Sequence, residues 1–174
     1  MNWPPPTAHV AVVVIALVAL VTDLRSRKVP NVLTFGAAGA ACLFQLVTGG
    51  WQGLLWACAG WTVGFVMFLP FFALGGMGAG DVKLLGAFGA WLGPLGALWT
   101  ALFGALAGGV LALVVSLAHN YTGTAFRNLG MLLRSWFLGG VRPIEGVTLS
   151  SSAGPRLPYA VPLAVGAVMA TWLR

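Results

Sequence analysis

Residues 75–83 read GGMGAGDVK and follow a long apolar run, residues 51–74, that holds no charged side chain. Asp81 in this stretch is one of only three acidic residues in the chain, with Asp23 and Glu145. Asp23 closes another apolar run. An ionisable group beside an apolar run of membrane length is costly, and is by default a candidate for function. The stretch therefore predicts a chain that crosses a membrane as helices and carries a functional carboxylate.

Composition favours a membrane protein over a water-soluble domain. Only 7% of the 174 residues are charged, 59% are hydrophobic and the mean hydropathy is +0.94, whereas soluble domains hold about 25% charged residues. The net charge of +6 would also suit nucleic acid, but the nine Lys and Arg residues stand between apolar runs. Charges that flank membrane spans are placed in this way. We expect a protein that contacts membrane lipid and does not bind nucleic acid.

The apolar runs predict an all-α fold, a polytopic membrane bundle of about six helices, because a span needs about 20 residues. Two of the runs end at short loops, Gly49-Gly50 and Gly93-Pro94. We expect a single membrane-embedded domain over residues 1–174. The predicted spans are residues 7–23, 31–48, 51–74, 81–93, 95–118 and 158–173.

The basic residues predict which side of the membrane each connection faces. Cytoplasmic connections carry an excess of Lys and Arg. Eight of the nine basic residues fall in three connections on one side of a six-span bundle, which should be cytoplasmic. They are Arg25, Arg27, Lys28, Lys83, Arg127, Arg134, Arg142 and Arg156.

The two candidate carboxylates are predicted to lie at similar depth. Residues 7–23 make about 25 Å of helix and residues 81–93 about 20 Å, against a hydrocarbon core about 30 Å thick. Measured from the outer face, Asp23 and Asp81 both fall in the cytoplasmic part of the membrane.

Residues 119–157 are more polar and are expected to form a cytoplasmic loop. Apolar side chains there recur at helical spacing with Arg127, Asn128, Arg134 and Ser135 between them, a pattern typical of an amphipathic helix on the membrane surface. The loop could act as a substrate gate or serve as a plain connector. The apolar positions are Phe126, Leu129, Leu132, Leu133, Trp136 and Phe137.

Two carboxylates in one place allow hydrolysis. They cannot both ionise cheaply, so one keeps a proton. The ionised member can take a proton from water as it attacks a peptide carbonyl, while the protonated member donates to the carbonyl oxygen. Taken singly, Asp23 could be a helix-end charge paired with Arg25 or Arg27, and Asp81 could be the N-cap of the helix that follows it. Their shared depth and side favour shared chemistry.

Other residues near Asp81 have less specific interpretations. Gly78 and Gly80 would let the backbone approach an extended substrate strand. Lys83 could bias the charge of the carboxylates or anchor its helix at the lipid headgroups. Cys42 and Cys58 stand in apolar stretches without Cys-x-x-Cys spacing, so we expect inert thiols and no metal site.

Three motifs carry a resemblance to a known family. Residues 78–81, GAGD, match the Gly-x-Gly-Asp signature of intramembrane aspartyl proteases, and the following Val82-Lys83 resembles the type IV prepilin peptidases. Asp23, with the basic run and Val29-Pro30-Asn31, is similar to the first aspartate motif of that family. Residues 157–162, LPYAVP, are similar to the proline-rich start of its last span.

The resemblance implies an aspartic endopeptidase of the bacterial inner membrane that needs no cofactor. Its substrate would be a prepilin, cut after a short basic leader at the cytoplasmic face. The residues implied as catalytic are Asp23 and Asp81; those implied for the loop or for substrate binding are Gly78, Gly80, Lys83, Asn31 and Pro158.

This chain differs in one respect from the larger members of the family that it resembles. Those members carry paired Cys-x-x-Cys motifs and also methylate the new N-terminus, whereas this chain lacks such motifs. It resembles the small, protease-only members that serve Flp-type (tight-adherence) pili. A proton-coupled transporter that uses Asp23 and Asp81 as a relay is the alternative, and a non-catalytic membrane scaffold is a third interpretation.

Overall fold

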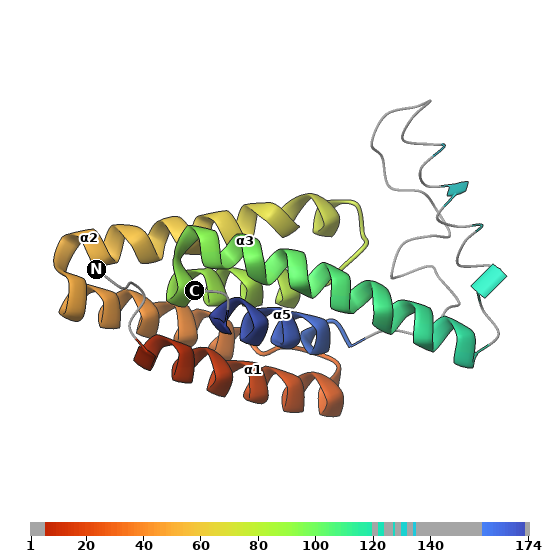
Figure 1. The fold of residues 1–174 in the computed structure, drawn as a ribbon, viewed down its shortest axis with the longest axis horizontal. Helices are drawn as coiled ribbons and strands as arrows, with labels where there is room; N and C mark the ends of the chain where they lie inside the picture. The colour runs from red at the N-terminus through yellow and green to blue at the C-terminus, as the bar shows by residue number, and fades with distance from the viewer. Residues whose placement is uncertain are drawn as a thin grey trace.

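The computed structural model describes residues 6–119 and 158–172, together with isolated positions between 122 and 134. In this part of the chain all regular structure is helical, which confirms the predicted all-α class. The helices, coloured from red to blue in Figure 1, are α1 (Pro6–Ser26), α2 (Asn31–Ala73), α3 (Ala79–Ala118) and α5 (Ala160–Trp172). By length and composition, α1, α2 and α3 are each able to cross a membrane, and α5 is a shorter apolar helix.

Helices α2 and α3 are each broken once by a glycine. Gly50 has φ 60° and ψ −151°, and Gly93 has φ 73° and ψ −179°, conformations that essentially only glycine adopts. Figure 1 shows that each helix doubles back at its break. Both breaks fall at short loops predicted from the sequence, and the second is reinforced by Pro94, which cannot donate a backbone hydrogen bond.

Each break divides its helix into two arms, the first before the glycine and the second after it. The second arm of α2, after Gly50, packs closely against the first arm of α3, before Gly93. A Cβ added at Gly60 would collide with the carbonyl oxygen of Gly89, and one added at Gly89 with that of Gly60. Farther along, a Cβ on Gly64 would come within 2.6 Å of Leu85 O. Small residues of this kind let membrane helices approach at backbone contact. The glycines therefore set the spacing between these two arms.

A buried polar pair joins the first arm of α2 to the break in α3. Gln45 is fully buried and its Nε2 donates to the carbonyl oxygen of Trp91 at 3.3 Å. The Trp91 indole N–H donates in turn to Ala37 O at 3.0 Å. The Gly93 break disrupts the helical hydrogen bonding around it, so a side-chain donor for a nearby carbonyl stabilises the turn away from water.

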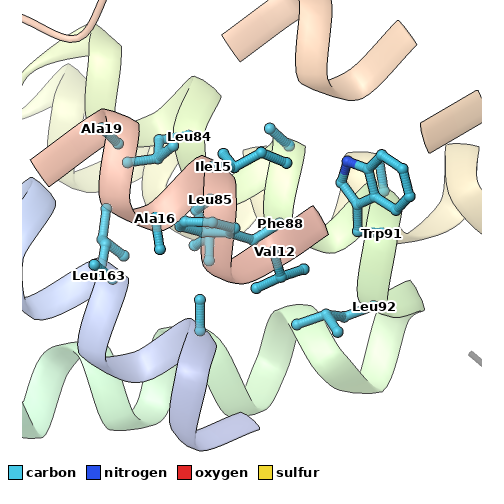
Figure 2. Packing of buried hydrophobic residues seen from close by; sticks show 14 of the residues in the cluster. Val12, Ile15, Ala16, Ala19, Leu84, Leu85, Phe88, Trp91, Leu92 and Leu163 are labelled. Carbon is cyan, nitrogen blue, oxygen red and sulfur yellow. The ribbon is translucent and has the colours of Figure 1, made fainter. Parts of the chain in front are cut away.

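The core is built mainly from α1, α3 and α5, with Ala38, Ala41 and Phe68 added from α2. Figure 2 shows Val12, Ile15 and Ala16 of α1 facing Leu85 and other apolar side chains of α3, with Leu163 of α5 at one side. Many side chains on the opposite faces of these helices are apolar and exposed, as expected of helices that contact lipid. The predicted amphipathic helix, with Phe126, Leu129, Leu132, Leu133, Trp136 and Phe137, lies outside the described residues.

Candidate active site

Asp23 lies in the last turns of α1 and is 7% exposed. Its Oδ2 accepts a hydrogen bond of 3.1 Å from the backbone N–H of Ala160, the first residue of α5. The first N–H groups of a helix lack partners within the helix, so α5 offers a donor and a positive dipole end to the carboxylate. This contact orients Asp23 differently from the pairing with Arg25 or Arg27 that the sequence also allowed.

Asp81 is 8% exposed and stands in the first turn of α3, three residues after the N-cap Gly78. Its Oδ2 accepts the Gly78 N–H at 3.2 Å, which is the backward arm of a capping box. The aspartate is thus not the N-cap itself, as one reading of the sequence suggested. A backbone N–H orients this carboxylate, as it does for Asp23.

The loop before Asp81 has a defined shape that begins at the end of α2. Gly75, with φ 72°, donates to Phe72 O at 2.9 Å, and Gly76 donates to Phe71 O at 2.9 Å. This pair of hydrogen bonds is a Schellman motif, which closes a helix with a left-handed residue. The motif turns the chain sharply from α2 toward Gly78 and α3.

The connection between α1 and α2 brings the two aspartates together. Arg27 adopts the left-handed conformation, with φ 51°, and its backbone N–H donates to the backbone carbonyl oxygen of Asp23 at 2.7 Å. Helix α1 ends there. Val29 then packs against Gly80, where an added Cβ would lie 3.3 Å from Val29 Cβ. The carboxylates of Asp23 and Asp81 are close enough for their charges to interact. Two interacting buried carboxylates share protons, which suits them to general acid–base chemistry.

Lys83 faces the start of α2. Its Nζ donates to Asn31 Oδ1 at 2.9 Å and lies 5.2 Å from the centre of the Phe35 ring. Asn31 is the first residue of α2 and follows Pro30. The two residues predicted to be near the site are thus bonded to each other, and they link the beginning of α2 to the beginning of α3.

The segment that leads into α5 completes the same end of the bundle. Pro158 O accepts the N–H of Val161 at 3.1 Å and so starts the helix. The Tyr159 hydroxyl donates to Gly76 O at 3.3 Å. Sequence reasoning missed Tyr159, although it stands within the recognised LPYAVP stretch.

The cysteines lie elsewhere, on the two arms of α2. The Cys42 and Cys58 side chains lie close enough to interact, and both are free thiols. Within residues 6–119 and 158–172, His, Cys, Asp and Glu side chains do not gather in groups of three or more that could hold a metal ion.

A family comparison bears on what this arrangement does. A model of the type IV leader peptidase family matches residues 10–113. The chain belongs to the type IV leader peptidase family. The matched segment holds both aspartates, the glycine loop, Asn31 and Lys83. A member of this family is a protease, and its apolar helices fit a membrane protein. No match was found among curated proteins or among solved structures.

Proposed function

We propose that the protein is an intramembrane aspartyl endopeptidase that removes the short basic leader of type IV prepilins. The observation that carries this proposal is the pairing of Asp23 with Asp81. These buried carboxylates come from α1 and α3, each is held by a backbone N–H at 3.1 and 3.2 Å, and their charges interact. Family membership supports prepilins as the substrate class.

In the proposed mechanism one carboxylate is ionised and the other protonated. The ionised member accepts a proton from a water molecule as that water attacks the carbonyl carbon of the peptide bond. The protonated member donates to the carbonyl oxygen and stabilises the charge that develops there. A proton returned to the amine then allows the new N-terminus to leave. The hydrogen bonds donated by the N–H groups of Ala160 and Gly78 hold one oxygen of each aspartate and so limit rotation of both carboxylates.

The proposal places this chemistry at the cytoplasmic face of the bacterial inner membrane, in a multi-pass bundle of about six crossings. The doubling back of α2 at Gly50 and of α3 at Gly93 supports that number. The basic residues Arg25, Arg27 and Lys28 support the orientation, since they follow Asp23 at the end of α1.

We further propose that the enzyme serves Flp-type prepilins and does not methylate the new N-terminus. Cys42 and Cys58 are the two cysteines of these 174 residues and are not spaced as a Cys-x-x-Cys motif. Mass spectrometry of pilin processed in the presence of S-adenosylmethionine checks this point. A product that gains one methyl group would contradict it.

The test of the function is leader removal by purified protein from a prepilin co-expressed or added as substrate. Asp23→Asn and Asp81→Asn should each abolish cleavage, because Asn can act neither as base nor as acid. Glu145→Gln is the matched control, since it removes the third acidic residue of the chain, and it should cleave normally. Near-normal cleavage by either Asn variant would overturn the aspartyl mechanism.

A further inference from the structure

The glycine loop between α2 and α3 keeps part of its backbone available. The N–H groups of Gly75 and Gly76 are used at the end of α2, and the N–H of Gly78 binds Asp81. The carbonyl of Gly76 accepts from Tyr159. Among residues 6–119 and 158–172, the backbone of Met77 makes no hydrogen bond. An extended peptide could therefore pair with the loop at Met77, four residues before Asp81.

Two consecutive residues at the start of α5 act on the two halves of the site. The Ala160 N–H binds Asp23, and the Tyr159 hydroxyl binds the loop that carries Asp81. The segment from Tyr159 to Ala160 thus contacts both Asp23 and the glycine loop that leads to Asp81.

Helix α5 is a firm support for this contact. Its Gly166 lies against α3, where an added Cβ would collide with Thr100 O. Leu163 is 2% exposed and belongs to the core that α1, α3 and α5 share. A hydroxyl carried at the beginning of such a helix has a fixed position. In the glycine loop, the side chain of Met77 packs against the core, and the Tyr159 hydroxyl adds a hydrogen bond to the backbone beside it, at Gly76 O.

We propose that Tyr159 is a positioning residue for leader cleavage. Its hydroxyl holds the Gly75–Gly80 loop against the start of α5, so that the Met77 backbone is ordered before the prepilin strand arrives. This inference rests on the proposed function, since it concerns how the same site receives its substrate. Without the hydroxyl, the substrate must order the loop as it binds, and that cost appears as weaker binding.

The experiment compares Tyr159→Phe with the wild type in steady-state cleavage of a prepilin leader peptide by purified protein. The net worth of one neutral hydrogen bond predicts a rise in KM of roughly three- to tenfold, with kcat within about twofold. Tyr159→Leu, which removes the ring as well, should raise KM at least as much. Thr171→Val is the matched control, because it removes a hydroxyl of α5 that bonds Val168 O within the helix, and its KM should not change.

Hydrogen exchange provides a second measurement on the same proteins without substrate. Amides of residues 74–80 should exchange faster in Tyr159→Phe than in the wild type, while those of α1 keep their rates. A wild-type KM together with wild-type exchange in both Tyr159 variants would overturn the inference. So would a fall in kcat at constant KM, which would put the phenol on the reacting atoms. Failure of the proposed function looks different, since the Asp23→Asn or Asp81→Asn variants would then still cleave.

Discussion

Lys83 and Asn31 are joined by a hydrogen bond of 2.9 Å between the ammonium group of one and the side-chain carbonyl of the other. The two residues are 52 positions apart. Asn31 is the first residue of α2, directly after Pro30, and Lys83 stands near the start of α3, two residues beyond Asp81. The ammonium group also lies over the Phe35 ring, a favourable cation–π position. The contact therefore sets where the start of α3 sits relative to the connection from Asp23.

Removal of this contact should reduce cleavage without abolishing it. Lys83→Met and Asn31→Ala should each lower kcat/KM by roughly three- to tenfold, because each removes one hydrogen bond near the site and neither removes a proposed reacting group. The double variant should be no worse than the poorer single variant, since both changes break one interaction. Cleavage rates of the three purified variants check this coupling.

Lys28→Met is the control for loss of positive charge, because Lys28 is exposed on the neighbouring connection. It should cleave at the wild-type rate. If the fold-loss of kcat/KM in the double variant equals the product of the losses in Lys83→Met and Asn31→Ala, the two residues act independently. That result would contradict a role for the hydrogen bond between them.

Gly89→Ala should destabilise the protein strongly for so small a change. The added methyl group would meet the backbone of Gly60, with Gly60 C at 2.7 Å and Ala97 Cβ at 3.1 Å. Backbone atoms cannot rotate away as a side chain can, so the arms of α2 and α3 must separate. Overpacking of this kind costs about 1–3 kcal/mol. Thermal unfolding in detergent should show a clear fall in Tm.

Gly39→Ala offers the matched control on the first arm of α2. Nothing lies within 4 Å of a Cβ added there, and alanine is the better helix former. Its Tm should equal or exceed that of the wild type. An equal fall in both variants would show that glycine matters for a reason other than close packing.

Cys42 and Cys58 should form a disulfide on mild oxidation in detergent, because the two free thiols lie close enough to interact across the two arms of α2. Oxidised wild type should lose maleimide labelling of both thiols, whereas Cys42→Ala should keep Cys58 reactive. The double Cys→Ala variant should retain cleavage, since the proposed chemistry uses neither thiol. Persistent labelling after oxidation would mean that the arms of α2 are arranged differently.

Orientation in the membrane can be tested with two nearly isosteric substitutions in the cysteine-free background. The substitutions are Ser26→Cys, at the last residue of α1, and Thr48→Cys, just before the break at Gly50. Both positions are exposed. If the basic residues mark the cytoplasmic side, an impermeant thiol reagent added to intact cells should label the cysteine at 48 and spare the one at 26. The opposite pattern would put Asp23 on the extracytoplasmic side.

Much of the fold could be predicted because its causes are local. A long apolar run can satisfy its backbone in a membrane only as a helix, so the helices around Val12 and Leu85 follow from composition. The breaks at Gly50 and Gly93 were predictable from glycine and proline pairs. The two aspartates stood out since acidic residues are so rare in the chain. The count of about six crossings and the surface helix in residues 119–157 stay predictions.

What the sequence determined by itself is thus the class of protein, the helices and the identity of the two candidate carboxylates. Asp81 binds the N–H of Gly78, a local contact only three residues away, whereas only the tertiary structure decided the partner of Asp23. The Ala160 N–H lies 137 residues from Asp23, and the Tyr159 hydroxyl lies 83 residues from Gly76. Such contacts depend on how whole helices pack, here through Gly60, Gly89 and Gly166, and no local propensity encodes them. Both carboxylates could be named from their neighbours in sequence, but the orientation of Asp23 required the packing of α5 against α1 and α3.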